Sequence, residues 1–335
     1  MLDLTPYLSY IYGVMFKRIL TISNTFNSFL FGARSTGKTT LLQKLFTKEN
    51  FYWFDLLDIE LEDRLAKKSN LLLDIINSLD KKIKYIIIDE IQKLPKLLDL
   101  IHQFLQKHPK RFIFILTGSS ARKLKSGGAN LLAGRAFVYN LYPLTFIELN
   151  EKFDLNEYLK FGGLPQVFTF KTNMDKNRFL KTYTLTYLKE EIWAEHIIKK
   201  LEPFRNFLEI AAQLNGDIIN YTKIARQINV DTKTVQNYFE ILQETLLGIT
   251  LNAYHTSIRK QIIQAPKFYF IDPGIKRALD NTLQIDLMEN TYAFGKAFEH
   301  FIIIQLYFLN QYYERDYKFY YFYPMMQCSI FYKTS

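Results

Sequence analysis

Short apolar runs alternate with amphipathic segments through the first part of the chain. Continuous apolar runs are typical of strands buried on both faces of a parallel sheet, whereas apolar residues at helical spacing indicate covering helices. The predicted strands cover residues 28–31, 51–55, 84–88 and 111–116, and the predicted helices cover residues 38–46, 71–79 and 97–106. This alternation predicts an α/β fold, with a parallel sheet sandwiched by helices. A leading helix over 15–20 is expected to pack against the sheet.

Helical spacing resumes in the second half of the chain. The predicted elements there are a long helix over 175–200, helices over 221–228 and 232–243, and strands over 247–251 and 267–271. A short turn separates the two middle helices, and Asp231 in that turn is the expected N-cap. Two helices joined by a turn and followed by two strands are typical of a winged-helix domain.

The second helix of this pattern carries polar residues that are expected to face outward. They are Thr232, Lys233, Gln236 and Asn237. Side chains of these types can contact the phosphates or base edges of duplex DNA. The alternative is that the helix pair only packs against the first domain or a partner protein, because no dense row of lysine and arginine lies on this helix.

Residues 28–42 contain a complete phosphate-binding loop. Gly32, Gly37, Lys38 and Thr39 match the spacing G-x-x-x-x-G-K-[ST], between a predicted strand and a predicted helix. The glycines permit a tight turn whose N–H groups point at phosphate oxygens, and the helix dipole adds to their field. Lys38 is expected to reach the β- and γ-phosphates, and the Thr39 hydroxyl to ligate Mg²⁺. The predicted nucleotide contacts in the loop are Gly32, Ala33, Arg34, Ser35, Thr36, Gly37, Lys38, Thr39 and Thr40.

Two acids follow the predicted strand over 84–88, at the edge where open α/β sheets bind their ligands. Asp89 is expected to hold Mg²⁺ through water, and Glu90 to orient or deprotonate the attacking water. The strand over 111–116 runs into small hydroxyl residues, of which Ser119 and Ser120 are candidates to sense the γ-phosphate. The alternative for these serines is an ordinary helix cap. This order of elements predicts a nucleotide hydrolase.

Five ordered motifs carry a resemblance to a known family. They cover residues 31–42, 87–93, 116–124, 132–135 and 142–148. Together they resemble the prokaryotic AAA+-type ATPases whose C-terminal domain contains a winged helix and a nuclease-like fold. The resemblance implies ATP and Mg²⁺ as cofactors, Asp89 and Glu90 as the Walker B pair, Ser119 and Ser120 in the sensor-1 region, and Arg135 as the arginine of the family's Gly-Arg motif.

A physical argument also favours Arg135 as a catalytic residue. A guanidinium stabilises the charge that develops on a transferring phosphoryl group, whether it comes from the same subunit or from a neighbouring one. The alternative is a surface arginine that pairs with an acid or with nucleic acid. Arg34 and Arg122 are the other arginines with a possible role of this kind.

The resemblance and the breaks in the pattern divide the chain into four predicted units. They are a P-loop ATPase core (1–140), a helical lid and linker (141–200), a winged-helix domain (201–280) and a truncated nuclease-like remnant (281–335). Glu299 corresponds to the first acid of the family's nuclease-like domain, but the further carboxylates that a divalent site requires are missing. No nuclease activity is therefore expected. His255 and His300 stand alone, and no metal role is expected for either.

The composition limits the classes of partner and the cellular compartment that we expect for the protein. The chain has 335 residues with 43 Lys and Arg against 33 acids, and its formal charge of +10 favours polyanionic partners. A single cysteine, Cys328, excludes an internal disulfide framework. The start of the chain does not resemble a signal peptide, and no apolar run is long enough to span a bilayer. We expect a soluble cytoplasmic protein.

The sequence therefore predicts an Mg²⁺-dependent ATPase in which hydrolysis moves the lid and winged helix relative to the core. The expected partner is duplex DNA or a protein client, and assembly into a homo-oligomer is left open. One competing hypothesis is a DNA-binding module in which nucleotide is only a structural ligand or a slow switch. Another is a truncated remnant whose tail is too poorly folded to function.

Overall fold

The computed structural model describes residues 16–46, 50–119, 134–187, 201–257, 264–322 and 330–333, together with the single positions 122, 124, 132 and 259. The predicted helical stretch beyond residue 187, as far as residue 200, lies outside the described residues. So do the predictions for Ser120 and Cys328.

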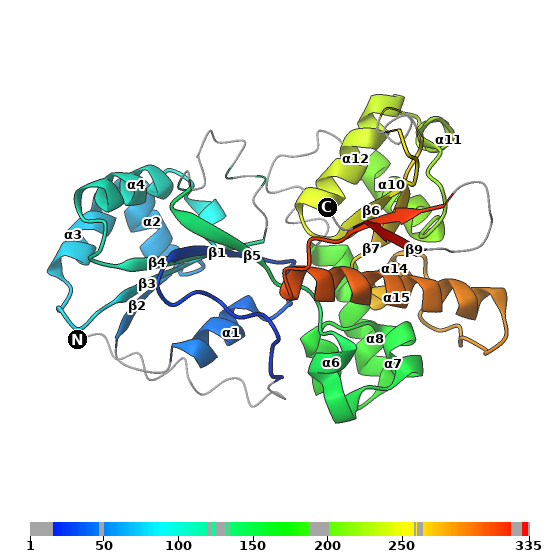
Figure 1. The fold of residues 1–335 in the computed structure, drawn as a ribbon, viewed down its shortest axis with the longest axis horizontal. Helices are drawn as coiled ribbons and strands as arrows, with labels where there is room; N and C mark the ends of the chain where they lie inside the picture. The colour runs from blue at the N-terminus through cyan, green and yellow to red at the C-terminus, as the bar shows by residue number, and fades with distance from the viewer. Residues whose placement is uncertain are drawn as a thin grey trace.

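A five-stranded parallel sheet forms the amino-terminal half, which confirms the predicted α/β class (Figure 1). Its strands are β1 (Asn27–Phe31), β2 (Phe51–Asp55), β3 (Tyr85–Asp89), β4 (Ile113–Gly118) and β5 (Ala136–Asn140). The strand order is β2-β3-β4-β1-β5, and every neighbouring pair runs parallel. The carboxyl ends of all five strands therefore meet at one edge of the sheet.

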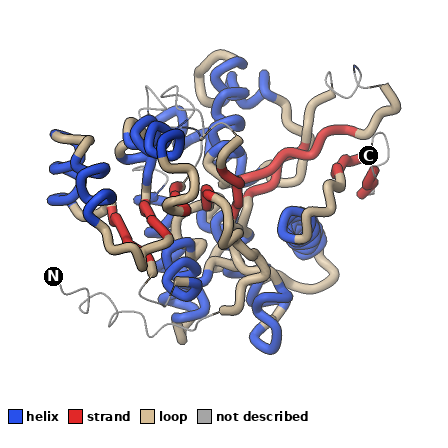
Figure 2. Tube along the Cα trace, turned by 60° about the vertical axis from the view of Figure 1, so that its left-hand side comes forward, coloured by secondary structure: helices blue, strands red, loops and turns tan. Residues whose placement is uncertain are grey.

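Helices cover both faces of this sheet, as Figures 1 and 2 show. One face carries α2 (Ile59–Lys67), α3 (Leu71–Ser78) and α4 (Leu97–Lys107), and the other carries α1 (Lys38–Leu45). Successive side chains of a strand point to opposite faces, so Phe29 and Phe31 pack toward α2–α4 while Leu30 packs toward α1. The strands β1, β3 and β4 are therefore buried on both sides.

The apolar core on the α1 side of the sheet continues into the second half of the chain. Leu30 of β1 and Leu42 of α1 belong to the same buried cluster as Leu141, Phe204 and Phe308, which come from the linker and from two distant helices. The two halves of the molecule therefore share one core instead of meeting at a polar boundary.

Helices dominate the second half of the chain. They are α6 (Phe146–Leu149), α7 (Leu155–Phe161), α8 (Asn173–Thr182), α10 (Leu201–Gln213), α11 (Tyr221–Gln227), α12 (Thr232–Glu244), α14 (Pro273–Leu279) and α15 (Tyr292–Tyr312). The predicted helices over 221–228 and 232–243 are thus present, and Asp231 caps α12 by accepting a bond of 2.8 Å from the backbone N–H of Thr234. Within the described ranges, no helix is both long and apolar enough to cross a membrane.

A second sheet joins the predicted wing to the predicted tail. β6 (Gly248–Ala253) and β7 (Lys267–Phe270) correspond to the strands predicted over 247–251 and 267–271, and they pair antiparallel. β8 (Lys318–Tyr321) adds to β6 in parallel, and β9 (Ile330–Lys333) adds to β8, which gives the order β7-β6-β8-β9. The strands of the tail are therefore part of the same sheet as the wing.

The predicted helix over 15–20 is wrong for the residues that the structure describes. Residues 16–20 have no helical conformation and run along the base of the phosphate loop instead. Arg18 makes four side-chain hydrogen bonds to groups from three other parts of the chain. These long-range bonds outweigh the local tendency of the segment to form a helix.

A buried carboxylate joins α7 to α14 and explains the Gly162-Gly163 turn. Asp272 caps α14 through a bond of 3.0 Å from the backbone N–H of Ile275, and it also accepts a bond of 2.6 Å from the N–H of Gly163. Gly162 has φ +76, and a side chain there would overlap the carboxylate of Asp272. Burial raises the pKa of Asp272 to about 6, despite the backbone N–H groups around it.

Candidate nucleotide-binding site

The phosphate loop lies between β1 and α1, at the carboxyl edge of the sheet. Gly37 is the N-cap of α1 with φ 93, a conformation that residues with a Cβ rarely adopt. A side chain at Gly32 would collide with the carbonyl of Leu141, just beyond the end of β5. Thr36 closes the loop, because its hydroxyl donates 2.8 Å to the carbonyl of Ala33. Both glycines of the motif therefore meet a structural requirement.

Lys38 lies against the backbone of the loop. Its Nζ donates to the carbonyl of Gly32 at 2.8 Å and to that of Ala33 at 3.4 Å, and the residue is only 6% exposed. A phosphate bound at the loop would offer this ammonium group a charged acceptor in place of two neutral carbonyls. Charge-assisted bonds are stronger, so the exchange is favourable.

The two predicted halves of the site meet at Asp89. The hydroxyl of Thr39 donates 2.9 Å to one carboxylate oxygen of Asp89, and the hydroxyl of Thr117 donates to the other. Burial raises the pKa of Asp89 above its ordinary value, although the bonds from the two hydroxyls oppose the rise. A carboxylate and a hydroxyl at this spacing form the hard-oxygen donor set that Mg²⁺ prefers, so the residues fit this ion.

Glu90 is held by a side chain that the sequence analysis did not assign. Its backbone has φ 60 and ψ 47, and its N–H donates 3.0 Å to the hydroxyl of Thr117. The amide nitrogen of Gln92 donates to the carboxylate of Glu90 and, at 3.4 Å, to the hydroxyl of Ser119. The amide oxygen of Gln92 is buried and has no hydrogen-bond partner. No local signal distinguishes Gln92, because Lys93 in the same turn is polar as well.

The remaining predicted loop residues differ in exposure. Arg34 is exposed, Ser35 and Thr40 are half-buried, and Ala33 and Thr36 are buried. Ser119 is also buried, at the end of β4 beside Gln92. The loop therefore presents mainly its backbone and Lys38 as groups that can bind phosphate.

Arg135 lies at the other end of the sheet, so of the two arrangements left open by the sequence it does not support the one in which Arg135 acts within its own subunit. It precedes β5, where Ala136 pairs with Asn27 at the start of β1, whereas the phosphate loop follows the end of β1. Five residues of strand separate the two ends, about 16 Å. The Arg135 guanidinium instead contacts the ring of His102 on α4, 3.1 Å from its Nε2. In this arrangement it cannot reach a nucleotide bound at its own loop.

The polar residues of α12 are accessible to different degrees. Lys233 and Gln236 are exposed, and Thr232 and Asn237 are half-buried. Arg122, from the segment after β4, forms an ion pair with Glu244 at the end of the same helix. A side chain from the segment that follows β4 therefore contacts the helix that we expected to meet DNA.

Glu299 pairs with basic and hydroxyl groups. It accepts 2.6 Å from the hydroxyl of Tyr269 and lies 3.4 Å from the Nζ of Lys267. His300, next to it, is buried and bonded to the carbonyl of Phe270 at 2.6 Å. Across the residues that the structure describes, no group of three or more His, Cys, Asp or Glu is arranged to hold a metal ion.

Two family models match the chain, one after the other. Residues 25–150 match a model described as an AAA domain, and residues 152–286 match one described as a domain of unknown function, DUF8612. The first match contains the phosphate loop, Asp89 and Glu90, and it supports nucleotide binding and hydrolysis in general. The second match assigns no activity to the second half.

Curated relatives are similar along most of the chain. An uncharacterized protein of Mycobacterium tuberculosis is 26% identical over 280 residues, which cover 83% of this chain and 61% of the relative. An uncharacterized protein of Methanocaldococcus jannaschii is 26% identical over 270 residues, which cover 72% of this chain and 60% of the relative. The chain thus spans about three fifths of the length of these relatives.

Solved structures are similar only distantly. A signal transduction ATPase with numerous domains from Pyrococcus horikoshii is 15% identical, with a TM-score of 0.26 and coverage of 88% of this chain and 50% of that chain. A DNA polymerase III gamma subunit-related protein of Thermotoga maritima is 14% identical, with a TM-score of 0.26 and coverage of 85% and 95%.

Proposed function

We propose, from the premise that residues 25–150 are a P-loop domain of the AAA type, that the chain binds ATP together with Mg²⁺ and hydrolyses the nucleotide. The observation that carries this proposal is the bond of 2.9 Å between Thr39 and Asp89. It brings the phosphate loop and the acid pair together although they lie 50 residues apart in the chain. A glycine turn that arose by chance would not be expected to lie beside a buried carboxylate at the edge of the sheet.

Each residue has a distinct role in this proposal. The loop amides and Lys38 bind the phosphates, and Thr39 and Asp89 would hold Mg²⁺. The bound ion would neutralise charge on the β- and γ-phosphate oxygens. Glu90 orients the attacking water and accepts its proton, once its carboxylate is free of the Gln92 amide.

We further propose that turnover changes how the second half of the chain engages a partner, which is duplex DNA or a protein. Two features support this coupling. The shared core links α1 to the helices of the second half, and the Arg122–Glu244 ion pair links the segment after β4 to α12. The exposed Lys233 and Gln236 on α12 are the residues that we expect to touch DNA, in a domain that we interpret as a winged helix.

Steady-state ATP hydrolysis by the wild type, Lys38→Ala and Glu90→Gln tests the enzymatic proposal. We expect Lys38→Ala to weaken ATP binding by about tenfold or more, because it removes the charged phosphate contact. Glu90→Gln should keep ATP binding and lose about 100-fold or more in turnover. Normal hydrolysis by Lys38→Ala would refute the assignment of the site.

The same assay with and without duplex DNA separates the competing functions. DNA-stimulated turnover that Glu90→Gln abolishes would support a switch that acts on nucleic acid. Tight ATP binding with negligible turnover in the wild type would favour a nucleotide-bound interaction module, which the Gln92–Glu90 bond is consistent with. Salt-sensitive DNA binding that Lys233→Ala weakens would then identify α12 as the contact.

A further inference from the structure

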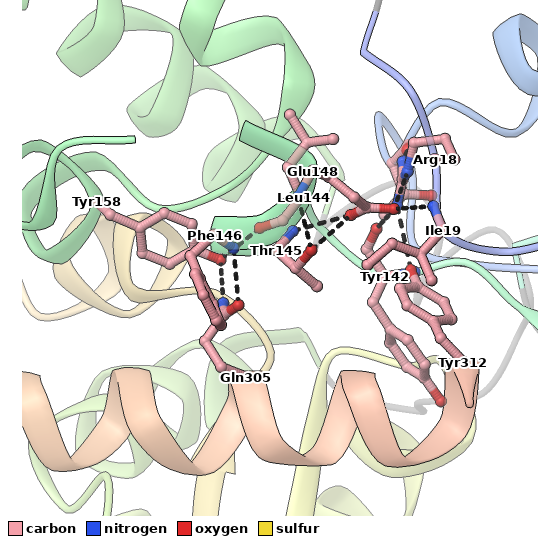
Figure 3. Close-up of polar contacts among 11 residues, drawn as sticks. Arg18, Ile19, Tyr142, Leu144, Thr145, Phe146, Glu148, Tyr158, Gln305 and Tyr312 are labelled. Carbon is pink, nitrogen blue, oxygen red and sulfur yellow. Dashed lines mark hydrogen bonds and ion pairs between the residues drawn. The ribbon is translucent and has the colours of Figure 1, made fainter. Parts of the chain in front are cut away.

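Arg18 connects the phosphate loop to the last residue of α15. One guanidinium nitrogen donates 2.7 Å to the carbonyl of Thr36 in the loop. The other donates 3.1 Å to the hydroxyl of Tyr312 and 2.6 Å to the carbonyl of Tyr142. Nε donates 2.9 Å to the carboxylate of Glu148 (Figure 3). Four acceptors from three parts of the chain therefore converge on one side chain.

The arginine is buried and its charge is balanced. The side chain of Arg18 is 6% exposed and that of Glu148 is fully buried. The same carboxylate accepts further bonds of 2.9 Å from the backbone N–H groups of Ile19 and Thr145. Burial alone would lower the pKa of Arg18, but Tyr312 and Glu148 outweigh it and raise the pKa. The charged pair is thus a fixed part of the structure.

Tyr312 is held in place independently of Arg18. Its hydroxyl accepts 2.9 Å from the backbone N–H of Tyr142, and its ring lies 5.8 Å from the ring of Tyr142. The ring of Tyr142 in turn stacks on Phe308, one helical turn earlier in α15. The position of the Arg18 guanidinium is therefore set by the docking of α15.

We propose that Arg18 is a positioning residue that couples nucleotide binding at the phosphate loop to the docking of α15. This inference rests on the proposed ATP binding. Arg18 holds the carbonyl of Thr36, next to Gly37, where a side chain would lie 3.8 Å from the guanidinium. When α15 is displaced, the Tyr312 hydroxyl moves away and the guanidinium shifts. The loop then loses the hydrogen bond from Arg18 to the carbonyl of Thr36.

The coupling works in both directions. A planar guanidinium has fixed donor directions, so it cannot reorient toward a moving loop and keep its bonds to Tyr312 and Tyr142. If docked α15 favours the phosphate-binding form of the loop, bound nucleotide favours docked α15 by the same factor. The partner-binding half of the chain thus senses nucleotide through one side chain.

Tyr312→Phe is the first test, because it removes one hydroxyl and leaves the charged pair and the ring packing intact. Gln305→Met is the matched control. Gln305 lies two turns earlier on α15 and docks the same helix through the N–H of Phe146 and the hydroxyl of Tyr158, without a bond to Arg18 (Figure 3). Both variants weaken the docking of α15, but only Tyr312→Phe removes a group that is hydrogen-bonded to Arg18.

Two readouts are measured on each variant. Titration with a fluorescent ATP analogue should give about fivefold to tenfold weaker binding for Tyr312→Phe and little change for Gln305→Met. Hydrogen exchange of the amides of residues 32–39, without nucleotide, should be faster in Tyr312→Phe only. The Arg18→Lys variant, alone and combined with Tyr312→Phe, completes a double-mutant cycle, and the double variant should bind no more weakly than Arg18→Lys.

Either of two results would overturn the coupling. One is unchanged loop exchange in Tyr312→Phe, and the other is equal effects of Tyr312→Phe and Gln305→Met on affinity and exchange. The exchange experiment needs no nucleotide. If the wild type failed to bind ATP, the proposed function would fall, while loop exchange would still decide whether Arg18 transmits the state of α15.

Discussion

A buried glutamine restrains the carboxylate of Glu90. The amide of Gln92 reaches Glu90 and Ser119, and it comes from the short 3-10 turn Ile91–Lys93 that follows β3. Glu90 has a left-handed backbone conformation, which is uncommon for a residue with a side chain. The surrounding structure therefore holds Glu90 in a backbone conformation of higher energy. We therefore infer that Gln92 restrains Glu90 until its carboxylate leaves the amide.

Replacement of Gln92 by methionine keeps the volume of the side chain and removes the amide. We expect turnover to rise by up to about tenfold with little change in ATP affinity, because the Glu90 carboxylate no longer has to leave the Gln92 amide before it accepts a proton, while the phosphate contacts remain. Steady-state kinetics and an ATP titration on the same preparation measure the two quantities. Weaker ATP binding with unchanged turnover would contradict the assignment.

The motif residues of the site could be predicted from sequence, because local spacing alone fixes them. The loop glycines, Lys38 and Thr39 stand within eight positions, and Asp89 and Glu90 directly follow an apolar run. Arg18 and Gln92 could not be predicted in their roles. The partners of Arg18 lie up to 294 positions away, and no local pattern encodes such a contact.

At the scale of elements, the junction between α7 and α14 depends on a position without a side chain. Gly162→Ala should destabilise the protein by about 2–4 kcal/mol, because it forces a Cβ into a positive-φ backbone and against the Asp272 carboxylate. Gly295→Ala is the control, since nothing lies within 4 Å of its added Cβ and the site is helical. It should stabilise the protein by about 0.5–1 kcal/mol. Denaturant unfolding checks both, and equal effects would contradict the prediction.

Asp272 also predicts a dependence of stability on pH. Its pKa is about 6 in the fold against 3.8 as the ordinary value, so between these values the folded protein binds the proton more tightly than the unfolded chain. Its contribution is therefore fully present below about pH 4 and is lost as the pH rises through about 6, by about 3 kcal/mol.

Asp272→Asn isolates this contribution because asparagine does not titrate. We expect the unfolding free energy of the wild type minus that of the variant to fall between about pH 4 and 6.5 and then to stay constant. Urea unfolding at a series of pH values measures the difference. A difference that rises with pH would mean that the backbone N–H groups outweigh burial and lower the pKa.

The first four strands of the parallel sheet and the helices α1, α3 and α4 were predicted from their apolar residues, whereas several other elements were missed, among them α10 and α15. The strand β5 and the helix α2 were not expected, because β5 is a half-exposed edge strand and α2 buries only Leu65. The helix expected over 15–20 was wrong, since the bonds of Arg18 decide the path of that segment. Tertiary contacts thus determined the conformation wherever the local pattern was weak.

At the scale of the whole molecule, the position of Arg135 bears on assembly. We propose that any action of this arginine on nucleotide is on the nucleotide of a neighbouring subunit, because its own loop lies at the other end of the sheet. Arg135→Ala should then leave ATP affinity unchanged and lower turnover by about 1000-fold, which is the scale of an arginine finger.

Mixing of two inactive variants tests this arrangement. Glu90→Gln supplies Arg135 but cannot hydrolyse, and Arg135→Ala keeps Glu90. Turnover should reappear when the two are combined at high concentration and decline again on dilution. If turnover does not return, Arg135 is a structural residue whose role is the contact with His102 on α4.

The parallel pairing of β6 with β8 has a consequence for the protein while it is being synthesised on the ribosome. Ala253 lies beside Tyr321, about 70 residues later in the chain. At about 5–20 residues per second, a ribosome needs several seconds to make the second strand after the first. During that interval one edge of β6 has no partner, and such an edge can pair with another chain. We expect nascent chains to need protection at this stage more than the finished protein does, which ribosome profiling of bound chaperones can detect.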